Sequence, residues 1–285
     1  MIKEKISIIG AGHMGGALIK GFVTKGEISP QNILASDPDR KKLEQLEQKC
    51  SIKWTQDNKE AVYWGDIVIL AVLPKYEVLY KVLSEISQVW TDPNKLLISI
   101  AAGVKCKDIE RVLNKKVRII RMMPNGPAEV GQGAIALCKG DHATDEDLNY
   151  VEKIFNKIGK TKIIHEEEKM DAVTGLSGSG PAYVFWFIKA LIKAGTKAGL
   201  SEEQSNSLAK QTVLGAAQIV IETKKSPGEL IKMIATRGGT TETALSILEE
   251  KSNLYKILIE AVAKARDKSK EVADKFHQRV KDEKK

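Results

Sequence analysis

The segment Lys5–Gly15, which reads KISIIGAGHMG, decides the fold of the N-terminal half. Three of its first five residues, Ile6, Ile8 and Ile9, are apolar and β-branched, which predicts a buried strand. The motif G-x-G-x-x-G follows at Gly10, Gly12 and Gly15, and a helical pattern continues over Met14–Lys25. Glycines between a strand and a helix are typical of dinucleotide-binding domains, where they permit a tight turn, close approach to a pyrophosphate and close helix packing. The alternative is a glycine turn with a structural role only.

The same alternation of strand and helix patterns continues to about residue 165. Further strands are expected at Asn32–Ala35, Ile67–Ala71, Leu96–Ile100, Val117–Arg121, Ala134–Leu137 and Thr161–Ile164. Further helices are expected at Asp39–Lys49, Tyr76–Val89, Lys107–Leu113 and Glu146–Ile158. Such alternation predicts a parallel sheet covered by helices on both faces.

Beyond residue 165 the pattern is helical throughout. Ser201–Gln204 and Ser226–Glu229 both match the capping box that opens helices, the second with Pro227 at the first helical position. We therefore predict an α/β fold class: a Rossmann-type NAD(P)-binding domain over residues 1–165, followed by an all-helical domain over residues 166–285. The boundary lies in the charged stretch Glu166–Lys169.

The end of the second expected strand bears on the choice of cofactor, because this position reaches the adenosine ribose. An acid, here Asp37, binds the 2′-hydroxyl of NADH, whereas Ser36, Arg40 and Lys41 suit the 2′-phosphate of NADPH. Asp37 followed by proline could equally serve to start the next helix. We expect NADPH, with NADH as the alternative.

Composition and charge exclude several other classes of protein. The 285 residues are 42% hydrophobic and 29% charged, as in a globular chain. Half of the net charge of +8 lies between Lys264 and Lys285, and aromatic residues are only 5%, so we expect a solvated basic tail and no nucleic-acid partner. Three separated cysteines and no apolar leader predict a cytoplasmic protein without disulfides or a metal site. The longest uncharged apolar stretch, Ala172–Ile188, is broken by Gly and Pro, so no membrane span is expected.

Six sequence blocks resemble the pyrroline-5-carboxylate reductase family, whose members make proline from a cyclic imine. The last two blocks, behind a Rossmann half, are the most specific. The blocks are Gly10–Ala17, Ala71–Pro74, Ser99–Gly103, Arg121–Pro127, Gly175–Val184 and Ala235–Leu245.

The resemblance implies the residues of the site. The imine, 1-pyrroline-5-carboxylate, would lie at Gly238, Gly239, Thr240 and Thr241, and subunits would pair through the helical domain as a homodimer or a higher homo-oligomer. The dinucleotide would lie along the glycine turn, the second strand end and three further segments. Its implied contacts are Gly10, Gly12, His13, Met14, Gly15, Ser36, Asp37, Arg40, Asn58, Ala71, Val72, Pro74, Ala101, Ala102 and Gly103.

Physical chemistry bears on the substrate loop independently. Gly238 and Gly239 before a helix start would present backbone N–H groups to a carboxylate, and the Thr241 hydroxyl could serve the imine nitrogen as the catalytic group. Taken alone, Thr240 or Thr241 would be an ordinary N-cap. Likewise, Ser177–Pro181 is either a flexible start to a helix or a close approach to the cofactor or partner subunit.

Two positions depart from the family pattern, in which Lys usually follows Ala-Val and Ser-Pro usually precedes Gly-Gly. Here Leu73 removes a cation near the cofactor site, and Thr236-Arg237 adds one near the substrate loop while removing proline's fixed φ. These changes bear on substrate affinity and loop rigidity rather than on the type of reaction.

The function we predict is transfer of a hydride to 1-pyrroline-5-carboxylate, giving L-proline, with positioning as the main source of rate. None of the four histidines is expected to have the neighbours of a general base. One alternative is a β-hydroxyacid dehydrogenase, which would need a lysine such as Lys189 or Lys193 on the first helix of the second domain. The other is a non-catalytic dinucleotide-sensing protein that acts through its basic tail.

Overall fold

The computed structural model describes residues 3–25, 28–251 and 253–283. The chain forms two compact units, of which the first comprises Met1–Ser179 with Ala263–Lys285 and the second Gly180–Val262. This division differs from the expected boundary between residues 165 and 166. Met170 is fully buried and Asp171 pairs with Arg121 of the sheet at 3.5 Å, so this stretch packs with the first unit.

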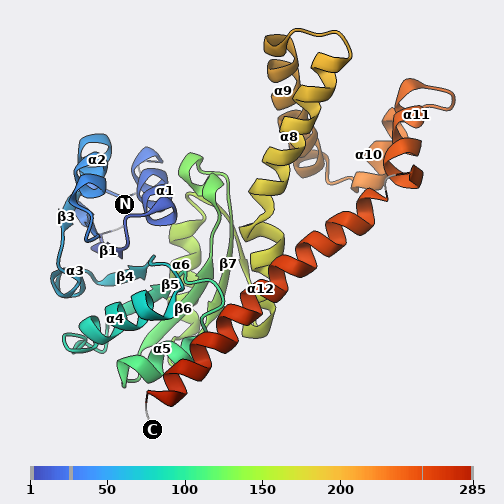
Figure 1. Cartoon of the computed structure of the whole chain (residues 1–285). Coiled ribbons are helices and arrows are strands. Elements are labelled where there is room, and N and C mark those ends of the chain that lie inside the picture. Colours follow the sequence, from blue (N-terminus) through green and yellow to red (C-terminus); the bar gives the residue numbers. More distant parts are fainter. Residues whose placement is uncertain (1–2, 26–27, 252, 284–285) are drawn as a thin grey trace. The chain divides into compact units, whose positions relative to one another are not determined.

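The first unit is built on an eight-stranded sheet with strand order β3-β2-β1-β4-β5-β6-β7-β8 (Figure 1). All neighbouring strands are parallel except one pair. The strands are β1 (Ile6–Ile9), β2 (Ile33–Ser36), β3 (Lys53–Thr55), β4 (Ile67–Leu70), β5 (Leu96–Ser99), β6 (Arg118–Met123), β7 (Gly133–Lys139) and β8 (Gly159–Ile163). The expected α/β class is confirmed.

The exception to the expected parallel sheet is the pair β6 and β7, which is antiparallel with Arg121 opposite Cys138. A parallel connection needs a dozen or more residues, usually a helix. The nine residues between Met123 and Gly133 hold only the short 3₁₀ helix η2 (Gly126–Val130). The chain therefore turns back on itself here.

Helices cover both faces of the sheet, as the sequence predicts. Alternate residues of the inner strands point to opposite faces, so Ile8 packs with one set of helices and Ile9 with the other. One face is covered by α1 (His13–Thr24), α2 (Arg40–Cys50) and α6 (Asp145–Phe155). The other is covered by α3 (Asn58–Trp64), α4 (Tyr76–Ser87), α5 (Cys106–Leu113) and the end of α12 (Leu254–Asp282).

The basic tail is not the solvated end that its charge suggests. It is the last part of α12, which belongs to the first unit. Four of its side chains are buried there, each at most 5% exposed: Ser269, Ala273, Phe276 and Val280. These residues recur every three or four positions, so they form one apolar face while Lys and Arg occupy the others. Residues 284 and 285 of the tail, like 1 and 2 of the N-terminus, lie outside the described residues.

The second unit is helical, as predicted. Both expected capping boxes form: Ser201 opens α9 and Ser226 opens α10, each with the reciprocal hydrogen bonds of its partner Gln204 or Glu229. Its helices are α8 (Gly180–Lys197), α9 (Glu202–Thr223), α10 (Pro227–Ile234), α11 (Thr240–Ser246) and the first turns of α12. The second unit also contains the π turn η5 (Ile247–Lys251). Shorter elements of the first unit are η1 (Pro30–Asn32), η3 (Glu167–Lys169), α7 (Met170–Val173) and the π turn η4 (Thr174–Gly178). Over the ranges described above, no helix is both long and apolar enough to cross a membrane.

Candidate active site

Three strand ends of the first unit meet at Gly10. Its backbone has φ +105°, in the left-handed region that favours glycine, and its N–H donates to the Ser36 carbonyl at 2.7 Å. A Cβ at Gly10 would lie 2.6 Å from the carbonyl oxygen of Ala71. The loops after β1, β2 and β4 therefore converge where the strand order reverses, which is the usual ligand crevice of a doubly wound sheet.

The other two motif glycines have different geometry. A Cβ at Gly15 would lie 1.9 Å from the Gly10 carbonyl oxygen, so α1 packs on the turn only because Gly15 has no side chain. A Cβ at Gly12 would meet no protein atom within 4 Å and would project into open space. Gly12 is also the N-cap of α1, which has no side-chain cap and no acidic residue in its first turn. This open, electropositive helix start fits a pyrophosphate.

The end of β2 carries Ser36 and Asp37, both buried. The Asp37 carboxylate accepts from the Ala11 N–H and from the Asp39 N–H, each at 2.9 Å. It therefore braces the glycine turn and does not cap α2, a task that falls to Asp39, whose carboxylate accepts from the Lys41 N–H. The reading of Asp37 as the cap of the next helix is wrong by two residues.

Asn58, at the start of α3, is held between two neighbours. Its carbonyl oxygen accepts from the Ser36 hydroxyl at 2.8 Å, and its amide donates to Glu85 of α4 at 2.9 Å. Ser36 and Asn58, distant in the sequence, are thus brought together beside Asp37. Sequence reasoning missed Glu85, which no motif marks.

The cations near this strand end are partly neutralised. Arg40 donates to Glu44 at 2.8 Å and lies over the Trp54 ring, while Lys42 lies 3.7 Å from Asp37 and 3.6 Å from Asp39. Arg40 is exposed and its pairing is a surface one that a phosphate could replace. The end of β2 therefore contains both a buried acid and exposed cations.

Two further loops of the first unit follow strands at the same edge of the sheet. Ala71, Val72 and Pro74 are half-buried after β4, whereas Leu73 is 63% exposed, so an apolar side chain faces outward where the family usually has Lys. After β5, Ala101 and Gly103 are buried and Ala102 is half-buried. The expected cofactor residues thus follow the carboxyl ends of β1 to β5, which lie at one edge of the parallel part of the sheet. His13 and Met14 lie at the start of α1 on the same side.

A polar cluster supports the next strand end. Arg121 is 1% exposed, and its guanidinium lies 3.4 Å from Glu167 and 3.5 Å from Asp171. Asn125 donates to the Ser177 carbonyl at 2.9 Å and accepts from the Ala134 N–H at 2.9 Å. Asn125 of the Arg121–Pro127 block thereby holds Ser177 of the Gly175–Val184 block, a contact that sequence reasoning had not assigned.

The expected substrate loop lies in the second unit. Gly238 has φ +72°, and its N–H donates to the Glu242 carboxylate at 2.6 Å. Gly239 caps α11, and its N–H donates to the Thr236 carbonyl at 2.9 Å. Two of the N–H groups expected to face a carboxylate are therefore engaged within the loop. Thr240 and Thr241 form the first turn of α11, with Thr241 half-buried.

Two histidines have carboxylate neighbours, contrary to expectation. His142 Nδ1 lies 2.8 Å from Glu110, and His277 Nδ1 lies 2.6 Å from Asp108. All three cysteines are buried free thiols. Among residues 3–25, 28–251 and 253–283, no three His, Cys, Asp or Glu side chains are grouped to hold a metal ion.

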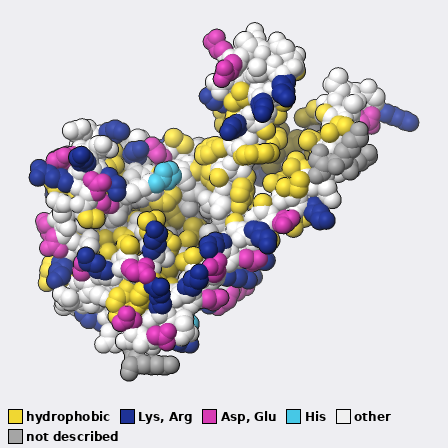
Figure 2. Space-filling view, in the orientation of Figure 1, with side chains coloured by type: hydrophobic (Ala, Val, Ile, Leu, Met, Phe, Trp, Pro, Cys, Tyr) yellow, Lys and Arg dark blue, Asp and Glu magenta, His cyan; other side chains and the backbone are white. Residues whose placement is uncertain are grey.

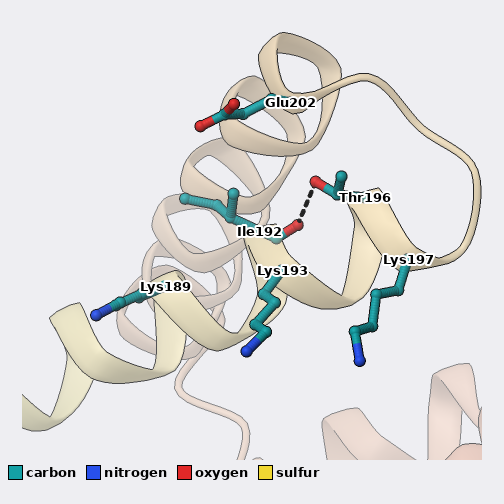
Figure 3. Close-up of a pocket in the computed structure, with 6 residues that line it drawn as sticks. All are labelled: Lys189, Ile192, Lys193, Thr196, Lys197 and Glu202. Atoms are coloured by element: carbon teal, nitrogen blue, oxygen red, sulfur yellow. Dashed lines mark hydrogen bonds between the residues drawn. The ribbon is translucent and has the colours of Figure 1, made fainter.

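Lys189 and Lys193 test the hydroxyacid dehydrogenase alternative. Both are exposed on α8 and line an open pocket of about 330 Å³ with Lys197 and Glu202 (Figure 3). The close-up shows the side chains of Lys193 and Lys197 extending to the same side of the helix. A catalytic lysine needs a shaped, water-poor site, so this pocket does not support that alternative.

The fold and the glycine crevice define a Rossmann-type, dinucleotide-dependent oxidoreductase. Residues 5–103 match the family model described as NADP oxidoreductase coenzyme F420-dependent, and residues 167–272 match the model of pyrroline-5-carboxylate reductase dimerisation. The chain belongs to the pyrroline-5-carboxylate reductase family. The helical region thus corresponds to a dimerisation domain.

Relatives in both sequence and structure support this membership over the whole chain. The pyrroline-5-carboxylate reductase of Methanosarcina acetivorans is 42% identical over 96% of this chain and 100% of that one. The Escherichia coli (strain K12) enzyme is 36% identical over 95% and 99%. The Coxiella burnetii structure matches with a TM-score of 0.86 at 34% identity, covering 95% and 99% of the two chains. The Plasmodium falciparum structure, which has NADP bound, also gives 0.86 and 34%, covering 96% and 99%.

Proposed function

We propose that this chain reduces 1-pyrroline-5-carboxylate to L-proline in the cytoplasm, with NADPH as the preferred reductant and NADH as an alternative. Full-length similarity to enzymes of that name supports the reaction. The observation that carries the cofactor assignment is the junction at Gly10, where loops after three strands meet beside an uncapped helix start. The Plasmodium falciparum relative with NADP bound favours NADPH.

Each part of the crevice has a task toward the dinucleotide. Gly10, Gly12 and Gly15, with His13 and Met14, would hold the pyrophosphate at the α1 N-terminus. Ser36, Asp37, Arg40 and Asn58 would face the adenosine ribose, and Ala71, Val72, Pro74, Ala101, Ala102 and Gly103 would form the wall toward the nicotinamide. The bound reduced nicotinamide supplies a hydride from its C4.

The substrate loop would hold the carboxylate and the imine nitrogen of 1-pyrroline-5-carboxylate. The hydride adds to C5 of the protonated imine, and the C=N π electrons become the lone pair of the amine nitrogen, which keeps its proton. Gly238, Gly239 and Thr240 would bind the substrate carboxylate with backbone N–H groups, once Glu242 releases the Gly238 N–H and the Thr236 carbonyl releases the Gly239 N–H. The Thr241 hydroxyl would hydrogen-bond the imine nitrogen and fix the ring. Binding therefore exchanges one carboxylate, Glu242, for another.

The second unit would pair with a second copy of itself to form a homodimer, on which a higher homo-oligomer can be built. Its helices carry large apolar side chains with high exposure, including Phe185 at 65%, Trp186 at 68% and Ile221 at 74%. Figure 2 shows apolar side chains along these helices. An exposed apolar surface of this kind marks an interface.

The Thr241→Ala variant tests the catalytic assignment. We expect turnover of 1-pyrroline-5-carboxylate with NADPH to fall by about tenfold to a hundredfold, since one oriented hydrogen bond in a water-poor site is removed. The matched control is Thr223→Ala at the end of α9, whose hydroxyl donates to the Ile219 carbonyl within its own helix. Full activity in Thr241→Ala, with the thermal midpoint unchanged, would exclude Thr241 from the mechanism.

A further inference from the structure

The last turns of α12 pack against the first unit in a way that neither the reaction nor the pairing surface explains. The match to the dimerisation domain ends at residue 272, yet Phe276 and Val280 beyond it are each 1% exposed. Both lie in the apolar cluster that contains β4, β5, α4 and α5. This part of the chain therefore belongs to the sheet-containing unit.

The segment contacts the loop after β4 at its far end. Tyr76 begins α4 two residues after Pro74, and its ring centroid lies 5.5 Å from that of Phe276. The Arg279 guanidinium lies 5.1 Å from the Tyr76 ring centroid and pairs with Glu77. Tyr76 is thus held by an aromatic contact and a cation.

The segment also contacts the loop after β5. Gly103 has φ +77°, and a Cβ there would lie 2.5 Å from the Ser269 carbonyl oxygen and 3.1 Å from the Ala273 nitrogen. The turn Ala101–Gly103 therefore rests directly on the α12 backbone. In α5, the helix that follows this loop, an Asp108 carboxylate oxygen lies 2.6 Å from His277 Nδ1.

A buried hydrogen bond fixes the start of the segment. The Ser269 hydroxyl donates to the Asp171 carboxylate at 2.7 Å, and Asp171 in turn pairs with Arg121 of β6. Ser269 is 5% exposed, so this bond is shielded from water. The segment is consequently tied to the elements that follow β4 and β5 and, through Asp171 of α7, to β6 itself.

We propose that Ser269–Arg279 is a positioning brace for the dinucleotide site, which sets the two loops Ala71–Pro74 and Ala101–Gly103 at their working separation. The proposal rests on the assignment of those loops to the dinucleotide under the proposed function. None of the brace residues need touch the cofactor. They act through Tyr76, Glu77 and Gly103, as supporting residues do behind a binding surface.

The test compares two buried phenylalanines of the full-length enzyme. Phe276→Leu loosens the brace, whereas Phe155→Leu makes the same change in the other core cluster, where Phe155 is 0% exposed and packs on Phe22. The readouts are the thermal midpoint and the dissociation constant of NADPH, measured by fluorescence without substrate. We expect both variants to lose stability, and only Phe276→Leu to weaken NADPH binding, by about threefold to tenfold.

Equal dissociation constants in the two variants would overturn the proposal. If Phe276→Leu does not fold, Arg279→Ala decides the matter, because Arg279 lies at the exposed end of the brace and its loss leaves the core intact. An unchanged NADPH dissociation constant in that variant overturns the brace, and a rise of about twofold or more supports it. Wild-type enzyme that binds NADPH but leaves 1-pyrroline-5-carboxylate unreduced would remove the proposed function and not the brace. Wild-type enzyme that binds neither NADPH nor NADH would overturn both.

Discussion

The Asp37 carboxylate accepts a hydrogen bond from the Ala11 N–H at 2.9 Å, which ties the end of β2 to the glycine turn after β1. One side chain thus braces the glycine turn and places a negative charge at the end of β2. Under the proposed function this charge would lie beside the adenosine ribose, and a 2′-phosphate would approach it with the help of Arg40, Lys41 and Lys42 of α2. The preference between NADPH and NADH would then depend on the balance of these charges.

Asp37→Ser shifts that balance toward NADPH. The serine hydroxyl can still accept from the Ala11 N–H, while the negative charge is lost. We expect the ratio of kcat/KM for NADPH to that for NADH to rise by about tenfold, which corresponds to about 1.4 kcal/mol. Steady-state kinetics with both cofactors measures it.

Asp39→Ser is the matched control for that prediction. It removes the same charge and keeps an oxygen able to cap α2, but Asp39 is exposed and does not contact the glycine turn. An equal rise in the ratio in both variants would show that net charge alone, and not the position of Asp37, governs the preference.

Substitutions at the motif glycines should affect NADPH binding and protein stability differently. Gly12→Ala adds a Cβ that meets no protein atom within 4 Å, so we expect the free energy of unfolding to change by no more than about 1 kcal/mol. The same methyl group projects toward the pyrophosphate, and the dissociation constant of NADPH should rise by about tenfold or more. Urea unfolding and NADPH titration give the two quantities.

Gly15→Ala should behave in the opposite way. Its Cβ would lie 1.9 Å from the Gly10 carbonyl oxygen, so α1 must move, at a cost of about 2 kcal/mol or more in the free energy of unfolding. A Gly15→Ala variant as stable as the wild type would contradict the close packing of α1 on the turn.

The sheet and its helices could be predicted because buried parallel strands are continuous apolar runs. The sequence pattern did not predict β3 or α3, because both elements are short. The strand has three residues, of which only Thr55 is buried, and the helix has seven residues. The antiparallel direction of β7 was not predicted, because an apolar strand pattern looks the same in parallel and antiparallel strands. It could have been inferred from the nine residues after Met123, too few for a parallel crossover.

The glycine turn was found because its motif is local, whereas its partners are not. The bonds of Asn58 to Ser36 and Glu85 join residues separated by more than twenty positions, and no spacing rule marks them. The packed tail could have been found from Ser269, Ala273, Phe276 and Val280, which recur every three or four residues. The excess of Lys and Arg on the other faces of α12 drew the prediction toward a solvated tail, so this apolar face was not recognised.

Arg121→Met tests the buried cluster behind β6. The change leaves the carboxylates of Asp171, 5% exposed, and Glu167 without their shared cation, so we expect a loss of about 3–5 kcal/mol in the free energy of unfolding. Adding Asp171→Asn should recover part of that loss, because one uncompensated charge is removed. A double variant less stable than Arg121→Met by the full cost of a second independent change would contradict the coupling.

The thiols should be inert in the folded protein. Burial raises the pKa of Cys138 to about 11 and that of Cys106 well above its ordinary value. At pH 7 the Cys138 thiolate is then about one part in ten thousand, and only thiolates react readily. Thiol-reagent labelling should be slow for the native protein and rapid in denaturant, whereas rapid native labelling of Cys138 or Cys106 would contradict their burial.

Isotope tracing follows the proposed hydride transfer to C5 of 1-pyrroline-5-carboxylate. The enzyme is incubated with the imine and with NADPH carrying deuterium at the transferable C4 position, and the product is analysed by mass spectrometry and NMR. We expect L-proline with one deuterium at C5. Recovery of unreduced imine, or of proline without deuterium at C5, would contradict it.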